Sequence, residues 1–78
     1  MKENPIEIRA WRQFIAVAEN LHFGNAAKQL HMTQPPLTHA IALLEARLGA
    51  RLFDRTKRSV ALTTAAIALL PQIGRAHV

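Results

Sequence analysis

Apolar residues recur three or four positions apart over the first two thirds of the chain, the spacing of one face of an α-helix. This pattern predicts a first helix from about Arg9, a second from Asn25 to Leu30 that starts at Gly24-Asn25, and a third from about Gln34 to Leu48. The apolar positions are Ile8, Trp11, Phe14, Ile15, Ala18 and Leu21, then Ala26, Ala27 and Leu30, then Leu37, Ile41, Leu44 and Leu48.

After the third helix the pattern changes. Gly49 stands where a left-handed residue commonly ends a helix. The stretch "RLFDRTKRSVALT" predicts two short strands, Leu52–Phe53 and Val60–Leu62, around a basic turn. A fourth helix is expected from near Thr63, and Pro71 should bend or fray it because proline lacks an amide donor. The fold class is therefore mainly α, with one small hairpin.

The bulk composition limits the possible functions. With 78 residues there is room for one domain, and without cysteine its core must hold without disulfides. The histidines His22, His31 and His39 match no metal-ligand spacing, so no metal site is expected. The five acidic residues form no pair, and no glycine-rich loop is present, so we expect neither an enzyme nor a bound cofactor.

The charge is strongly uneven. The formal net charge is +5, and the segment from Arg47 to Arg58 contains a cluster of basic residues and only one acidic residue, Asp54. That cluster indicates a polyanionic partner, with a merely solvated basic loop as the alternative. The cluster comprises Arg47, Arg51, Arg55, Lys57 and Arg58.

The longest apolar run, from Ala65 to Leu70, is too short to span a bilayer, and the N-terminus has no signal-peptide pattern. We therefore expect a cytoplasmic protein with no membrane partner.

The third helix opens with two prolines, which the first turn of a helix tolerates because its amide donors have no partner there. Thr33 is consequently a weak side-chain cap, and Gln34 could serve equally. The side chains on the face opposite the apolar stripe are small and almost all uncharged, so this face can lie in close contact with a partner. The alternative is a solvent-exposed face whose residues only favour helix formation. The residues of this face are Pro35, Thr38, His39, Ala42 and Ala46.

Two helices joined by about three residues have the geometry of a helix-turn-helix, whose second helix enters the DNA major groove by its N-terminal end. That end carries Gln34, Thr38 and His39, which can bond to base edges. The basic hairpin would then lie over phosphates. An RNA-binding winged helix would need exposed aromatic residues, and a membrane-surface peptide would need one long basic amphipathic helix; neither pattern is present.

The stretches "FGNAAKQLHMTQPPLT", "LEARLGARLFDR" and "VALT" resemble the N-terminal DNA-binding domain of LysR-type transcriptional regulators, over residues 6 to 71. The resemblance implies a winged helix-turn-helix, with a three-helix core and a small hairpin wing, followed by a linker helix that dimerises. It implies double-stranded DNA as the partner and regulation of transcription as the function. The implied base-reading residues are Gln34, Pro35, Thr38 and His39. The residues expected to contact the DNA backbone or minor groove are Thr33, Arg55, Lys57 and Arg58. The residues expected on the dimerisation surface of the linker helix are Ala65, Ile67, Leu69 and Leu70.

The sequence departs from the family pattern in three respects. It has Thr38-His39 where the family usually has Ser-Arg, and Ala66 where a glycine usually stands. The third difference is that the family has a large effector-binding domain, which we do not expect within these 78 residues. A small-molecule effector would act only through that domain. We therefore expect a DNA-binding domain over 1–62 and the start of a linker helix over 63–78, with a homo-oligomer in the full-length protein and weak association of this segment alone.

The C-terminal residues Ile73–Val78 form the string "IGRAHV". The nucleotide string ATCGGAAGAGCACACGTC, which resembles a common sequencing adapter, encodes this hexapeptide. We hypothesise that these residues are not native sequence; an ordinary helix tail is the alternative, and the codons in the nucleotide record decide between them.

Overall fold

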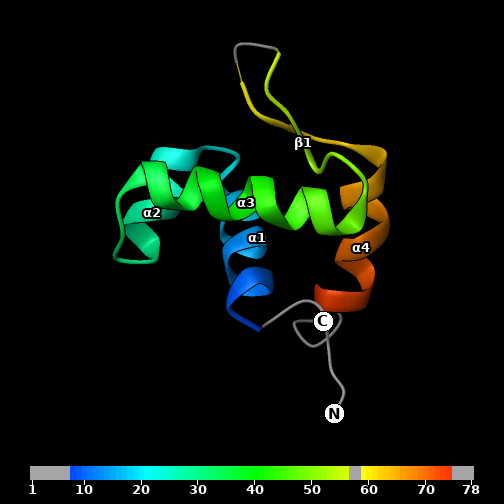
Figure 1. The fold of residues 1–78 in the computed structure, drawn as a ribbon, viewed down its shortest axis with the longest axis horizontal. Helices are drawn as coiled ribbons and strands as arrows, with labels where there is room; N and C mark the ends of the chain where they lie inside the picture. Colours follow the sequence, from blue (N-terminus) through cyan, green and yellow to red (C-terminus); the bar gives the residue numbers. More distant parts are fainter. Residues whose placement is uncertain (1–7, 57–58, 75–78) are drawn as a thin grey trace.

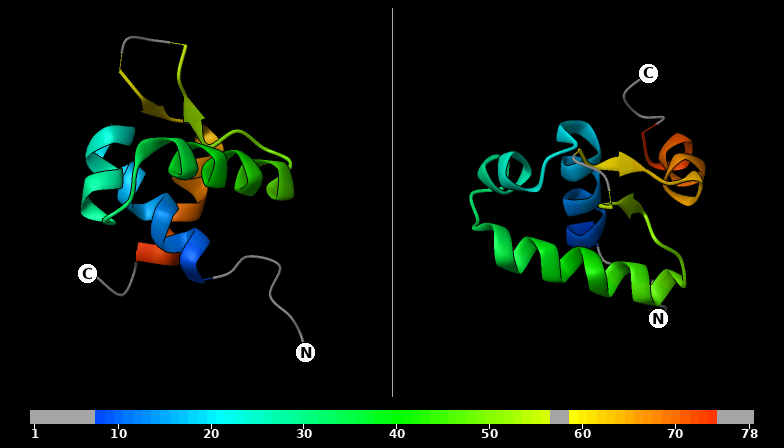
Figure 2. Two further views of the ribbon diagram at one scale, coloured as in Figure 1. Left: turned by 60° about the vertical axis from the view of Figure 1, so that its left-hand side comes forward. Right: turned by 90° about the horizontal axis from the view of Figure 1, so that it is seen from above.

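A computed structural model describes residues 8–56 and 59–74. Within these ranges the chain forms four helices and one two-stranded antiparallel hairpin, in which Phe53 pairs with Leu62 and Asp54 with Ala61. Helix α3 crosses in front of α1, with α2 at one end of it and α4 at the other, and the hairpin projects beyond the helices (Figure 1 and Figure 2). The elements are α1 (Ile8–Asn20), α2 (Phe23–Gln29), α3 (Gln34–Leu48), β1 (Phe53–Asp54), β2 (Ala61–Leu62) and α4 (Thr64–Gly74).

One buried apolar cluster joins these elements. The predicted stripe of α3 is part of it, which confirms that face as the core, whereas Leu30 and Leu48 are only partly buried beside it. Phe53 of β1 lies between two aromatic rings, with its centroid 5.6 Å from that of Phe14 and 5.9 Å from that of Phe23. The cluster comprises Phe14, Ala16, Val17, Phe23, Ala26, Ala27, Leu37, Ile41, Leu44, Leu52, Phe53 and Ala66.

The predicted apolar stripe of α1 is wrong at both of its ends. Ile8 is 73% exposed and Leu21 is 42% exposed. The helix ends at Asn20, and Leu21 takes a left-handed conformation with φ of 51°, so helical periodicity no longer governs where its side chain points. In the middle of the helix, Ala16 and Val17 are buried although the stripe did not include them.

Helix α2 begins two residues earlier and ends one residue earlier than the sequence pattern predicts. Its N-terminal cap is His22, whose Nδ1 accepts a hydrogen bond from the Asn25 amide at 3.0 Å. Histidine is not among the preferred capping residues, which is why the sequence pointed to Gly24-Asn25 instead. The earlier start makes Phe23 the first helical residue and buries its ring in the core.

Helix α3 has the predicted bounds. Thr33 is its N-cap and makes no capping bond with its side chain, as expected when two prolines follow. Gly49 has φ of 69° and donates its amide to the Glu45 carbonyl at 2.9 Å, which confirms the left-handed C-terminal cap.

The strands are displaced slightly from their predicted positions, Leu52–Phe53 and Val60–Leu62. In the structure they are Phe53–Asp54 and Ala61–Leu62, and the amide of Leu52, just before β1, donates to the side chain of Glu45. Helix α4 starts at Thr64, and the Thr63 hydroxyl accepts from the Ala66 amide at 3.2 Å.

Helix α4 continues past Pro71 to Gly74, so the expected fraying at Pro71 is wrong. A proline in a helix removes one amide donor from the ladder of hydrogen bonds. Ala66, the residue that stands where the family usually has glycine, is fully buried, so its methyl group fills space in the core. The first turns of α4 therefore share the core of the other helices.

Candidate nucleic-acid interface

The four proposed base-reading residues lie together on the outer face of α3. Gln34, Pro35 and His39 are exposed and Thr38 is half-buried, and with Ala42 they line one shallow hollow. Because the opposite stripe of α3 is fully buried, the rotation of the helix is fixed and this face points outward. The structure thus brings together the residues that the sequence selected by spacing.

The N-terminal ends of α2 and α3 meet beside this face. A Cβ atom on Gly24 would lie 2.9 Å from Cε1 of His22 and 3.4 Å from Oε1 of Gln34. The first distance is shorter than real Cβ contacts, so a side chain at this position would displace His22. Gly24 therefore leaves room for the capping imidazole and for the Gln34 amide.

A buried carboxylate that sequence reasoning missed ties the hairpin to α3. Glu45 is 7% exposed, and its Oε2 accepts from the amide of Leu52 at 2.7 Å and from the amide of Phe53 at 3.3 Å. Sequence reasoning listed Glu45 only as one of five scattered acids. The available signal was its place on the α3 wheel, next to the apolar stripe, in a segment that is otherwise basic.

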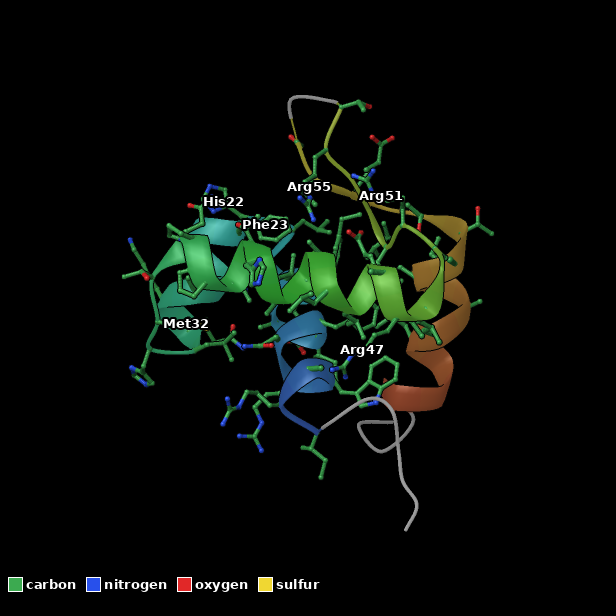
Figure 3. All side chains as sticks on the ribbon, in the orientation of Figure 1. His22, Phe23, Met32, Arg47, Arg51 and Arg55 are labelled. Atoms are coloured by element: carbon green, nitrogen blue, oxygen red, sulfur yellow. The ribbon has the colours of Figure 1, made fainter. Side chains whose placement is uncertain are left out.

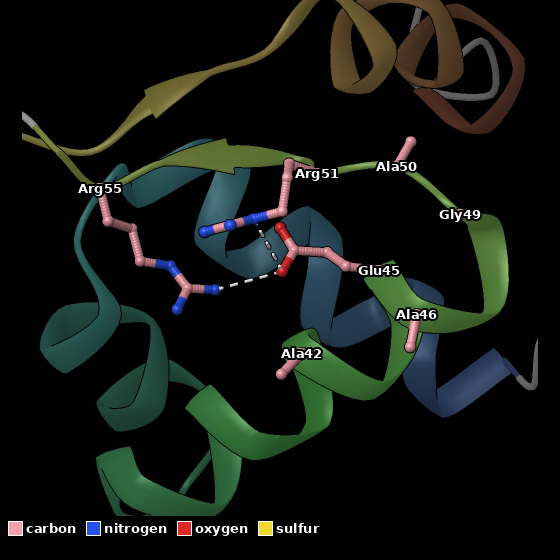
Figure 4. Close-up of a pocket in the computed structure, with 7 residues that line it drawn as sticks. All are labelled: Ala42, Glu45, Ala46, Gly49, Ala50, Arg51 and Arg55. Carbon is pink, nitrogen blue, oxygen red and sulfur yellow. Dashed lines mark ion pairs between the residues drawn. The ribbon is translucent and has the colours of Figure 1, made fainter.

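Two arginines flank the other oxygen of this carboxylate (Figure 4). Arg51 Nε lies 3.7 Å and Arg55 Nη2 lies 3.5 Å from Oε1 of Glu45. The Arg55 guanidinium also stacks on Phe23, 4.7 Å from the ring centroid, and its Nε and Nη2 atoms are buried without a hydrogen-bond partner. Arg55 is therefore held at the base of the hairpin by Glu45 on α3 and by the ring of Phe23 on α2.

The two arginines differ in exposure. The side chain of Arg51 is 69% exposed, whereas that of Arg55 is 30% exposed. Both lie on the hairpin side of α3 with His22 and Phe23, while Arg47 lies on the opposite side (Figure 3). Sequence reasoning selected Arg55 and not Arg51, although Arg51 presents more of its charge to the solvent.

The hairpin turn begins with a local polar motif. Asp54 Oδ1 accepts from the amide of Thr56 at 3.0 Å and from its hydroxyl at 2.6 Å. This pattern is an Asx-type turn, which directs the chain out of the short sheet. The proposed contacts Lys57 and Arg58 lie outside the described residues.

The proposed dimerisation residues on α4 do not form a single exposed face. Ile67 is 55% exposed, whereas Ala65, Leu69 and Leu70 are partly buried and pack against the core of the domain itself. The spacing of these residues in sequence could not show this division, because it depends on how α4 docks.

Residues 8–56 and 59–74 contain no group of three or more His, Cys, Asp or Glu side chains that could hold a metal ion. Over the same residues, the helices are too short or too polar to cross a membrane.

Three helices, with the second and third joined by a tight turn, followed by a hairpin define a winged helix-turn-helix domain. The family model for "Bacterial regulatory helix-turn-helix protein, lysR family" matches residues 8–67. The chain therefore belongs to the LysR family of bacterial regulatory helix-turn-helix proteins.

The relatives are regulators from several bacteria. Over 68 residues the chain is 54% identical to the HTH-type transcriptional regulator IlvR of Caulobacter vibrioides, covering 87% of this chain and 23% of that protein. Over 60 residues it is 57% identical to the HTH-type transcriptional regulator AlsR of Bacillus subtilis, covering 77% of this chain and 20% of that protein. The chain thus spans about a quarter or less of the length of these relatives.

Solved structures match the fold closely. The Corynebacterium glutamicum OxyR C206 mutant superposes with a TM-score of 0.86 at 39% identity, over 96% of this chain and 24% of that one. The CbnR_DBD-DNA complex superposes with a TM-score of 0.82 at 44% identity, over 90% of this chain and 80% of that one.

Proposed function

We propose that this chain is the DNA-binding domain of a bacterial transcription regulator and binds double-stranded DNA in a sequence-dependent manner. The observation that carries the proposal is the gathering of Gln34, Pro35, Thr38 and His39 on one outward face at the N-terminal end of α3. Related domains at 44% and 38% identity have been crystallised as the CbnR_DBD-DNA complex and the BenM_DBD/benA site 1 DNA complex, which supports the same partner here.

The chemistry of this face suits the edges of base pairs. The Gln34 amide can accept and donate at the same time, which is the pattern of N6 and N7 of adenine in the major groove. Thr38 and His39 can each donate or accept, and the ring of Pro35 offers an apolar surface to a thymine methyl group. With no long charged chain among them, these residues let the helix approach the bases closely.

Cations and a hydroxyl border this face and would meet the phosphates. Thr33 precedes the helix, and the hairpin side contributes Arg51 and Arg55. Lys57 and Arg58, which lie outside the described residues, are further proposed phosphate contacts. Phosphate contacts of this kind position a protein without reading the sequence. Because the bacterial chromosome lies in the cytoplasm, we place the protein there.

Assembly with a second copy completes the proposal. One reading helix spans only a few base pairs, so such domains bind as dimers across two half-sites. The surface for that contact would lie along α4, where Ile67 is exposed next to Ala65, Leu69 and Leu70. A small-molecule effector would act through a separate domain of the full-length protein.

Selection of a binding site from a random duplex library tests this function. Gln34→Ala should reduce affinity for the selected site by about 1–3 kcal/mol, through preference at one base pair. Gln29→Ala, which removes an exposed glutamine of α2, is the matched control and should leave that preference unchanged. If no sequence is enriched, or if Gln34→Ala weakens binding to shuffled duplexes by as much, these residues do not read bases.

A further inference from the structure

The two oxygens of the Glu45 carboxylate face different groups. Oε2 accepts from two backbone amides, those of Leu52 and Phe53, and so anchors the hairpin. Oε1 faces the guanidinium groups of Arg51 and Arg55 at 3.7 and 3.5 Å. Anchoring needs only a neutral acceptor, so the negative charge itself has a second effect, which falls on the two arginines.

The two ion pairs are unequal. Arg55 is held by the Phe23 ring as well as by Glu45, and only 30% of its side chain is exposed. Arg51 is 69% exposed, and its Nε is 3.7 Å from Oε1, which is too long for a hydrogen bond. The Arg51–Glu45 pair therefore joins a buried carboxylate to an exposed guanidinium, which a second anion such as a phosphate can reach from the solvent.

This cluster borders the face proposed to read DNA. The hollow that contains Glu45, Arg51 and Arg55 is also lined by Ala42 and Ala46, and Ala42 lines the hollow of the base-reading residues too. A duplex lying on α3 would therefore bring its phosphates toward Arg51 on the hairpin side of the helix (Figure 4).

We propose that Glu45 limits sequence-independent attraction to DNA by competing with phosphates for Arg51. This inference rests on the proposed function, because it concerns the same interface. In the folded protein the carboxylate attracts the Arg51 guanidinium and offsets one of the two positive charges. A phosphate must displace it before Arg51 contributes a contact, so Arg51 adds less to non-specific binding than a free surface arginine does.

Glu45→Gln separates the two effects of the side chain. The amide oxygen still accepts from the Leu52 and Phe53 amides, while the charge that attracts Arg51 is gone. Released Arg51 should add about one phosphate contact, which steepens the slope of log K against log salt by roughly 0.9. The ratio of affinities for a shuffled duplex at about 50 and 200 mM salt should then rise roughly 3.5-fold.

Matched variants keep the test specific. Glu19→Gln makes the same change in net charge at an exposed site on α1 and should leave the slope nearly unchanged. Adding Arg51→Gln to Glu45→Gln should return the slope to that of the wild type. A wild-type slope in Glu45→Gln, or an equal increase in Glu19→Gln, would overturn the proposal.

Arg51→Gln alone provides a second test. Because the Arg51 side chain is largely exposed, this substitution should leave the fold intact. Because Glu45 already competes for Arg51, this variant should lower the slope by well under 0.9. A loss of a full 0.9 would show that Arg51 contacts phosphate in spite of Glu45, and would refute the competition. Absence of wild-type binding to any duplex would instead refute the proposed function, so the two failures are distinguishable.

Discussion

One hydroxyl group joins the start of α4 to the segment that leads into the hairpin. Thr63 Oγ1 donates to the carbonyl of Arg51 at 2.6 Å and accepts from the amide of Ala66 at 3.2 Å. Thr63→Val removes both hydrogen bonds and keeps a side chain of nearly the same shape. The effect of this substitution on the free energy of unfolding therefore reports the two bonds rather than lost packing.

The expected loss of unfolding free energy in Thr63→Val is the sum of the contributions of the two hydrogen bonds. Loss of an N-terminal cap costs typically about 1 kcal/mol, and a neutral hydrogen bond contributes about 0.5–1.5 kcal/mol net. Thr63 is only half-buried, so water can reach the Arg51 carbonyl and offset part of the second loss. We expect a destabilisation of about 2 kcal/mol, out of a total of about 4–12 kcal/mol for a domain of this size.

Urea unfolding followed by circular dichroism measures this change. With a slope of about 1 kcal/mol per molar urea, the midpoint for Thr63→Val should fall by about 2 M at an unchanged slope. Thr63→Ser keeps the hydroxyl and should remain near the wild type, as should Thr64→Val at the exposed neighbouring position. If the valine variant is as stable as the serine variant, the two bonds do not hold α4 in place.

Two further predictions concern the core and the assembly. Ile41→Ala removes most of a fully buried side chain and should lower the free energy of unfolding in urea by about 2–5 kcal/mol. Leu43→Ala, at a position 51% exposed on the same helix, should lower it far less. Equal losses would mean that the stripe of α3 is not the core. Sedimentation should find this chain mainly monomeric at micromolar concentration. The reason is that Leu69 and Leu70 pack inward, which leaves Ile67 as the exposed large apolar side chain of α4 among the described residues. A tight dimer at this concentration would contradict that reasoning.

The helices and the core could be predicted because they depend on local periodicity. Leu37, Ile41 and Leu44 share one side of a helix wherever that helix is placed, and burying that side is the main way for a short chain to form a core. The bounds of α3 were predictable for a similar reason, since two prolines and Gly49 act on the backbone within one turn.

The ionic contacts at the hairpin could not be predicted in the same way. Glu45 and Arg55 are ten positions apart, and their meeting depends on how the chain returns after Gly49. The capping by His22 was missed because it depends on the rotamer of an uncommon capping residue. Such features follow from tertiary geometry, on which spacing along the chain gives little information.

The short segment from Arg51 to Phe53 connects the reading helix to α4. On one side its amides at Leu52 and Phe53 donate to Glu45 of α3, and on the other its carbonyls at Arg51 and Leu52 accept from the hydroxyl and the amide of Thr63. These bonds fix the direction in which α4 leaves the domain relative to α3. In a dimer formed along α4, that direction sets the distance between the two reading helices, and hence the spacing of half-sites on DNA. A substitution at Thr63 would therefore alter the preferred half-site spacing without touching any residue that faces a base.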